Sequence, residues 1–251
     1  MTDVINNLKN VQTNFRNVQN NLKSVKDELN KKTDKFLKTL KPKLRGYFHA
    51  IGFFTTLVIL IPFIVCFFYW KFDLNILLYF AVQLTTFGIS ATYHIYKFSE
   101  TSKKIMQRLD HMSIFLLISG TQTAVLNNTP KKFDVDIKWS IWLSWLVAFI
   151  GIVRKACIHE CFSFTDVAIY IVHGCLVSFS FKTLMAFYLF DLIFVILGGV
   201  FYILGGFIIG FEWPDPKPEI YGFHELFHTL TLLGNSCFSI VVFKSYFYRS
   251  V

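Results

Sequence analysis

The sequence predicts an all-α membrane protein, a bundle of seven transmembrane helices preceded by an N-terminal cytoplasmic helix. Its composition is 54% hydrophobic and 18% aromatic, with a mean hydropathy of +0.48. A soluble domain of 251 residues does not need that much apolar surface for its core. Seven apolar stretches follow one another from residue 46 onward, and Lys and Arg lie unevenly between them. The chain is therefore predicted to be an integral, multi-pass membrane protein.

The apolar stretches define the expected spans of the domain 46–251. Their ranges are 46–70, 74–96, 109–127, 137–153, 164–181, 183–211 and 221–247. Each is close to the ~20 residues that cross ~30 Å of hydrocarbon, although the third and fourth are short. The fifth and sixth are nearly continuous, and Lys182 is interpreted as the outer turn of a hairpin between them.

The distribution of basic residues predicts that the N-terminus faces the cytoplasm. With that orientation, 18 of the 25 Lys and Arg residues lie in inner segments and 7 lie in outer ones. The positive-inside rule favours this arrangement, and an odd number of spans then places the C-terminus outside. Topology and attraction to anionic inner-leaflet lipid explain the net charge of +9. Membrane lipids are the expected partners, and nucleic acid is not.

Residues 1–45 form a separate polar unit that is expected to lie in the cytoplasm. Apolar residues recur there at alternating steps of four and three, at Val4, Leu8, Val11, Phe15, Val18, Leu22, Val25 and Leu29. This pattern over about four heptads predicts a coiled coil, which would form a homodimer through residues 4–29 or dock a partner. The lysines favour the alternative of an amphipathic helix on the inner leaflet. Both interpretations stay open.

Two histidines, His224 and His228, stand at i and i+4 in the last apolar stretch. On a helix this spacing puts both imidazoles on one face, as a single Zn²⁺ requires. A third histidine, His94, ends the second span, with Ser90 one turn before it, and Asp110 opens the third span. In the predicted orientation all of these side chains lie near the cytoplasmic face. Ionisable groups in membrane helices are costly, so their common depth predicts a metal site.

The expected chemistry of this set is hydrolysis. Three neutral imidazoles bind Zn²⁺ and leave its fourth tetrahedral position open for water. Asp110 is predicted to act as general base towards that water, and Ser90 to assist it or to hold an oxyanion. A site between helices that opens to lipid would suit a lipid ester or amide as substrate. The alternative is that the histidines bond neighbouring carbonyls and join helices.

Residues 224–228 also match the metalloprotease signature H-E-x-x-H. In most such enzymes the third ligand lies downstream, but residues 229–251 contain no His, Asp or Glu. An upstream ligand is required, which fits His94 and argues against a standard zinc peptidase. Glu225 is expected on a different helical face, near the inner interface, where it caps the helix or pairs with a lysine.

Other polar residues are given different roles. His49 is interpreted as an interfacial residue, with support of the metal site as the alternative. His173 and Asp191 are expected to hydrogen-bond one another across the hairpin. The cluster at 157–161 resembles a metal site, but free thiols in a reducing compartment are favoured, and five cysteines give no disulfide framework.

Four segments carry a resemblance to a known family. Residues 90–94 (S-A-T-Y-H) resemble an S-x-x-x-H motif, and 108–121 resemble a segment written LDHxxIxLLIxGT. Residues 198–202 (G-G-V-F-Y) and 222–234 resemble the family's sixth and last spans. Together they resemble the hemolysin III and progestin/adipoQ receptor family, which includes the adiponectin receptors, in order and spacing over about 46–247.

The resemblance implies a seven-helix bundle with the N-terminus inside. It also implies zinc held by His94, His224 and His228, with Asp110 and Ser90 beside it. Members of the family are hormone or lipid receptors, and they are related to ceramidase-type lipid hydrolases. Two functions are therefore expected: a zinc-dependent hydrolase of a ceramide-type lipid, or a signalling receptor in which zinc is structural and a lipid is the ligand. The short loops disfavour a receptor for a protein hormone.

Overall fold

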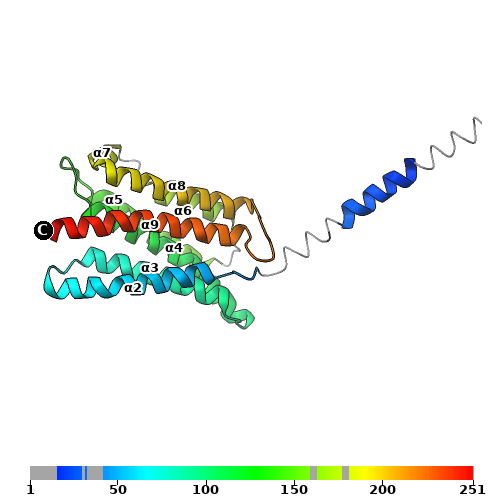
Figure 1. The fold of residues 1–251 in the computed structure, drawn as a ribbon, viewed down its shortest axis with the longest axis horizontal. Coiled ribbons are helices and arrows are strands. Elements are labelled where there is room, and N and C mark those ends of the chain that lie inside the picture. Colours follow the sequence, from blue (N-terminus) through cyan, green and yellow to red (C-terminus); the bar gives the residue numbers. More distant parts are fainter. Residues whose placement is uncertain (1–15, 30–31, 33–41, 159–162, 177–180, 251) are drawn as a thin grey trace, which may run out of the picture.

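The computed structural model describes residues 16–29, 32, 42–158, 163–176 and 181–250, and its regular structure over these residues is helical apart from two isolated bridges. The helices from residue 47 onward pack side by side along one direction (Figure 1). The expectation of an all-helical membrane bundle is confirmed in this form. The chain is an integral, multi-pass membrane protein.

The helices correspond to the apolar stretches of the sequence, and several of their boundaries differ from the expected ones. They are α2 (Tyr47–Tyr69), α3 (Leu74–Ile95), α4 (Glu100–Asn128), α5 (Lys138–Cys157), α6 (Phe164–Cys175), α7 (Phe181–Ala186), α8 (Leu189–Phe211) and α9 (Phe223–Ser250). Five of them, α2, α3, α5, α8 and α9, are long and apolar enough to cross a membrane. α4 has 29 residues but begins with polar turns, and α6 has 12 residues. The count of seven spans and the direction of the termini stay predictions.

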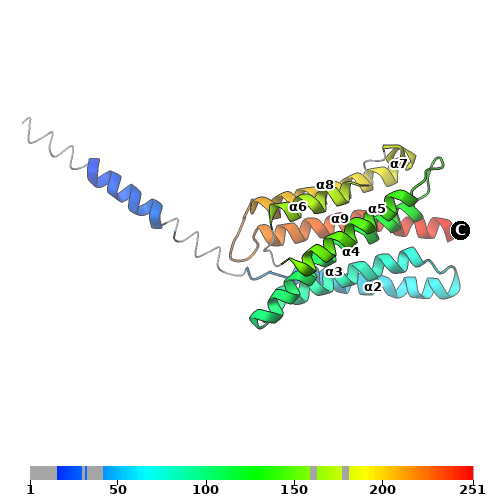
Figure 2. The same cartoon turned by 180° about the vertical axis from the view of Figure 1, so that it is seen from behind.

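α9 runs through the middle of the bundle, with α2 and α3 on one side and α6 and α8 on the other (Figures 1 and 2). It packs against α8, α4 and α2, while α3 packs against α2 and α4. One end of the bundle gathers the start of α2, the end of α3, the start of α4 and the start of α9. The C-terminus lies at the other end. The chain thereby brings residues near 49, 94, 110 and 224 to one layer.

Side-chain caps determine where several helices begin. The Asp73 carboxylate accepts from two backbone amides at the start of α3, and the Ser99 hydroxyl accepts from the Ser102 amide at the start of α4. Ser163 and Asp166 form a capping box at the start of α6. Because Ser99 caps α4, this helix starts nine residues before the expected boundary at residue 109, and its first turns project beyond the bundle (Figure 1).

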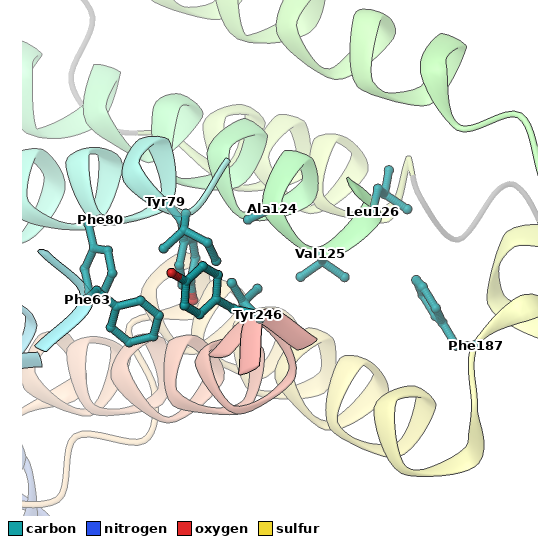
Figure 3. Packing of buried hydrophobic residues seen from close by; sticks show 10 residues of the cluster. Phe63, Tyr79, Phe80, Ala124, Val125, Leu126, Phe187 and Tyr246 are labelled. Atoms are coloured by element: carbon teal, nitrogen blue, oxygen red, sulfur yellow. The ribbon is translucent and has the colours of Figure 1, made fainter. Parts of the chain in front are cut away.

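An aromatic cluster fills the bundle towards its C-terminal end (Figure 3). Its buried members are Phe63, Ile76, Tyr79, Phe80, Ala124, Val125, Leu126, Phe187, Val242 and Tyr246. The Phe63 ring lies 5.1 Å from that of Phe80 and 5.2 Å from that of Tyr246, between centroids. Such ring pairs add to the stability that burial itself provides. This cluster packs α2, α3 and α9 together at the end of the bundle opposite to the layer that contains residues 49, 94, 110 and 224.

The interpretation of Lys182 as a hairpin turn is wrong. Lys182 lies inside the short helix α7, and the next long helix begins at Leu189. α7 ends at Ala186, and the next residue, Phe187, is fully buried and its backbone bridges to Lys131. The expected sixth span, 183–211, is therefore split, because α7 ends at Ala186 and α8 begins only at Leu189, after an extended residue at Tyr188. The periodicity of a continuous apolar run does not reveal such a break.

The N-terminal unit is helical over residues 16–29, and every side chain in that range is exposed. The apolar positions Val18, Leu22, Val25 and Leu29 are among them, with 56–65% exposure. The first half of the predicted seam, from Val4 to Phe15, lies outside the described residues. Formation of a homodimer through residues 4–29 stays a prediction.

Candidate metal centre

Three histidines from two helices meet at the end of the bundle where α9 begins. His94 lies in the last turn of α3, and His224 and His228 lie in the first two turns of α9. Their ligand nitrogens all lie within 4.8 Å of one another. His94 and His228 are buried, and His224 is half-buried. The fold therefore brings together the three residues that were predicted as metal ligands.

The spacing and chemistry of the three imidazoles suit a metal ion. The Nε2 atoms of His94 and His224 are 3.2 Å apart. Two nitrogens that bind the same tetrahedral Zn²⁺, each at ~2.0–2.1 Å, are themselves about 3.3 Å apart. The same distance also permits a hydrogen bond between the two rings, which is the helix-joining alternative. The group could bind a metal ion, and its donor set is compatible with zinc.

Asp110 and Ser90 lie beside the histidines. The Oδ2 atom of Asp110 is 3.7 Å from Nε2 of His94, and the side chain of Asp110 is 13% exposed. Ser90 is buried one turn before His94, and its hydroxyl is a hydrogen-bond partner of the Asp110 carboxylate. α4 thus supplies a carboxylate next to the ligand of α3. The five residues singled out in the sequence form one contiguous group.

The first turn of α9, which carries His224, is capped by two carboxylates. The Gly222 amide donates to Oε2 of Glu225 at 2.8 Å, and the Phe223 amide donates to Oδ1 of Asp215 at 3.0 Å. These carboxylates satisfy amides that a helix start leaves without intrahelical partners. The capping role expected for Glu225 is confirmed. Its ionic partner is an arginine, Arg45, and not a lysine.

The interfacial interpretation of His49 is wrong. Its side chain is 3% exposed, and its ring stacks on that of His228 with centroids 3.8 Å apart and planes within 6°. His49 stands in the first turn of α2, at the same end of the bundle as the three candidate ligands. The sequence placed His49 close to the depth of the predicted site. It did not show how α2 is rotated about its axis, which turns the His49 side chain into the bundle. Arg45 was not among the predicted site residues, because it precedes the first apolar stretch.

The expected hydrogen bond between His173 and Asp191 is also wrong. His173 Nε2 lies 3.1 Å from the Ser119 hydroxyl and 3.0 Å from the Ser144 hydroxyl. Asp191 instead accepts from the Lys244 ammonium at 2.6 Å. His173 thus bonds to α4 and α5, whereas Asp191 bonds to α9. Both sites join helices and lie outside the candidate metal centre.

The cysteine cluster at 157–161 lies partly outside the described residues. Cys157 is an exposed free thiol, and Cys66, Cys175 and Cys237 are free as well. These four agree with the expectation of unpaired thiols. Residues 159–162 are outside the described part of the chain.

A comparison with known protein families matches residues 37–239 to the family described as haemolysin-III related. The match covers well over half of the chain. It begins just before α2 and ends inside α9, so it contains all five residues of the candidate site. Most of the N-terminal unit lies outside it.

Proposed function

Because the chain belongs to the haemolysin-III-related family, we propose that it is a zinc-dependent hydrolase that cleaves an amide or ester bond of a membrane lipid. A ceramide-type amide is the favoured substrate class. One observation carries the proposal: three buried or half-buried imidazoles converge within 4.8 Å, with a carboxylate 3.7 Å from one of them. Such a set of neutral nitrogen donors with an adjacent base is typical of hydrolytic zinc sites.

His94, His224 and His228 would hold the metal, and Asp110 and Ser90 would serve the reaction. Bound Zn²⁺ supplies Lewis acidity, which polarises a carbonyl and makes water more acidic. Asp110 takes a proton from the attacking water at Oδ2, and it returns this proton to the leaving amine or alcohol. Ser90 orients the Asp110 carboxylate through its hydroxyl. Proton count is thereby conserved over the hydrolysis.

The position of the group in the bundle supports a lipid substrate. The candidate ligands lie at the ends of α3 and α9, both of which are apolar enough to cross a membrane. A membrane lipid keeps its amide or ester bonds at the boundary between headgroups and hydrocarbon. A site near the end of a span therefore lies at a depth that these bonds reach.

We also propose seven spans with the N-terminus in the cytoplasm. The start of α2 and the end of α9 lie at opposite ends of the bundle, which supports an odd number of crossings (Figure 1). The basic residues then lie mainly inside, and the candidate site lies near the cytoplasmic face. Tags on the two termini should differ in protease access in sealed vesicles. Equal access at both ends would refute this topology.

A signalling receptor with a structural metal is the second candidate. Its support is that side chains bridge α3 to α9: the His94 and His224 rings are in contact, and the Asn235 amide donates to Gln83 at 2.8 Å. A metal bound between these helices would link their positions. Binding of a lipid could then shift the packing of α3 against α9.

One experiment separates the two candidates. The protein is purified in detergent, its metal content is measured, and its turnover is tested on panels of ceramides and phospholipids. A hydrolase should carry about one Zn²⁺ per chain and should lose turnover with a chelator and regain it with Zn²⁺. Zinc without turnover on any lipid would favour the receptor. Protein that carries no metal after folding in zinc-containing medium would refute both.

A further inference from the structure

The chain segment that leads into α2 crosses the candidate metal centre. We call residues 42–49 the strap. Its backbone is tied to the loop before α9, because the amides of Lys43 and Leu44 donate to the carbonyls of Glu219 and Ile220 at 3.0 and 3.2 Å. The strap is therefore held in place by hydrogen bonds that do not involve the histidines. From this position it touches the surroundings of each candidate ligand.

Gly46 in the strap lies against His94. Its φ of 90° is in the left-handed region, which glycine adopts at little cost. A Cβ atom at this position would lie 2.8 Å from Cβ of His94 and 3.3 Å from its carbonyl carbon. The close approach leaves His94 little freedom to move towards the strap.

Arg45 in the strap is tied to the residue after His224. Its guanidinium forms an ion pair and a hydrogen bond with Glu225, whose side chain is only 1% exposed. Glu225 also caps the helix through Gly222. A buried carboxylate that is bound at both oxygens fixes the first turn of α9, and with it the backbone that carries His224.

His49, at the end of the strap, lies flat on His228. The two rings are almost parallel, with centroids 3.8 Å apart. Neither ring nitrogen of His49 has a hydrogen-bond partner in the described part of the chain, although both are buried. His49 therefore contacts its neighbour through the face of its ring. A flat contact of this kind restricts rotation of the His228 imidazole.

We propose that Arg45, Gly46 and His49 are positioning residues of the metal centre, with one of them supporting each of the three ligands. This inference rests on the metal binding proposed above. Residues around metal ligands commonly set their orientation, and replacing them lowers metal affinity by about 10–100-fold. The strap is suited to this role because one continuous segment contacts His94, the helix turn that carries His224, and the ring of His228.

The decisive test uses the full-length protein in detergent with two variants of one residue. His49→Phe keeps a flat ring and removes both nitrogens, whereas His49→Leu removes the ring. Zn²⁺ affinity is measured by competition with a chelator, and Co²⁺-substituted protein reports ligand geometry by its visible absorption bands. We expect His49→Leu to lower affinity about 10-fold or more and to change the Co²⁺ bands. His49→Phe should stay close to the wild type in both.

Matched controls come from the far end of the same helices. Phe63→Leu removes a buried aromatic ring from α2, and Lys244→Gln removes the partly exposed partner of the buried Asp191 carboxylate. Arg45→Gln is compared with Lys244→Gln. All of these variants should lower thermal stability in the metal-free protein. Only those in the strap should also reduce the further stabilisation that added Zn²⁺ gives.

Three results would overturn the inference. The first is that the wild type binds zinc and that both His49→Leu and Arg45→Gln bind it with unchanged affinity. This result would overturn the positioning role and leave the proposed function in place. The second is a loss in His49→Phe equal to that in His49→Leu, because the nitrogens and not the stacked ring would be required. The third is wild-type protein without zinc, which removes the proposed function as well.

Discussion

The two ends of the same three helices are built in different ways. Towards the C-terminal end, α2, α3 and α9 meet through edge-on and tilted aromatic rings, as the Phe63 ring does with those of Phe80 and Tyr246 (Figure 3). Towards the other end they meet through three imidazole rings, with the His228 ring stacked on that of His49 and edge-on to that of His94.

The difference shows where each kind of interaction tolerates change. Dispersion contacts in the aromatic cluster are weak one by one and numerous, so neighbouring rings share the loss of any one of them. A metal ligand acts through one nitrogen at one distance, and no neighbour can replace it. We therefore expect stability to depend on the aromatic end and metal binding to depend on the polar end.

The largest expected effect is the loss of a ligand. His94→Ala, His224→Ala or His228→Ala should each lower Zn²⁺ affinity by about 100-fold or more, because a three-ligand site cannot compensate for a missing donor. Metal content of the purified variants, measured by elemental analysis, checks this. Full zinc content in all three variants would mean that the histidines only join helices, as the alternative interpretation holds.

The next effect separates chemistry from metal binding at the same end. Asp110→Asn keeps the shape of the side chain but cannot accept the proton, so lipid turnover should fall by about 10²–10⁴-fold. Zinc content should stay near that of the wild type, since Asp110 is not one of the three ligands. Turnover and metal content are measured on the same preparation. Unchanged turnover with bound zinc would disprove the proposed role of Asp110.

Truncation in the aromatic cluster should have the opposite pattern. Phe63→Ala removes a ring that is 3% exposed, and we expect a loss of about 3–5 kcal/mol in the free energy of unfolding. Zinc affinity at temperatures well below unfolding should not change. Thermal unfolding in detergent and chelator competition measure the two quantities. A tenfold loss of zinc affinity in this variant would break the division between the two ends.

The smallest effect on the centre should come from the N-terminal unit. Removal of residues 1–36, which lie outside the family match, should leave zinc content unchanged.

The isolated peptide 1–45 should be helical in a concentration-dependent way if residues 4–29 form a coiled coil. Circular dichroism over a range of concentrations tests this. Helicity that arises only with anionic vesicles would support the membrane-surface alternative.

Local patterns in the sequence were sufficient for α2, α3 and α9 and for the candidate ligands. The i, i+4 spacing of His224 and His228 places both rings on one face of any helix, whatever surrounds that helix. The apolar runs likewise predict α2, α3 and α9 to within a few residues, because the hydrocarbon thickness sets their length. Counting spans then placed His94 and Asp110 in the same layer before any contact was known.

Only the tertiary structure decided which side chains face one another. Nothing in the spacing of Arg45 or His49 shows that they reach Glu225 and His228, since this depends on how α2 is rotated and how it crosses α9. For the same reason His173 bonds two serines and Asp191 bonds Lys244, where the sequence predicted a bond between them. Periodicity encodes the buried face of a helix, while the partner of each residue on that face follows from packing. In this chain the sequence determined the donors of the candidate metal centre, and the packing determined which side chains surround them.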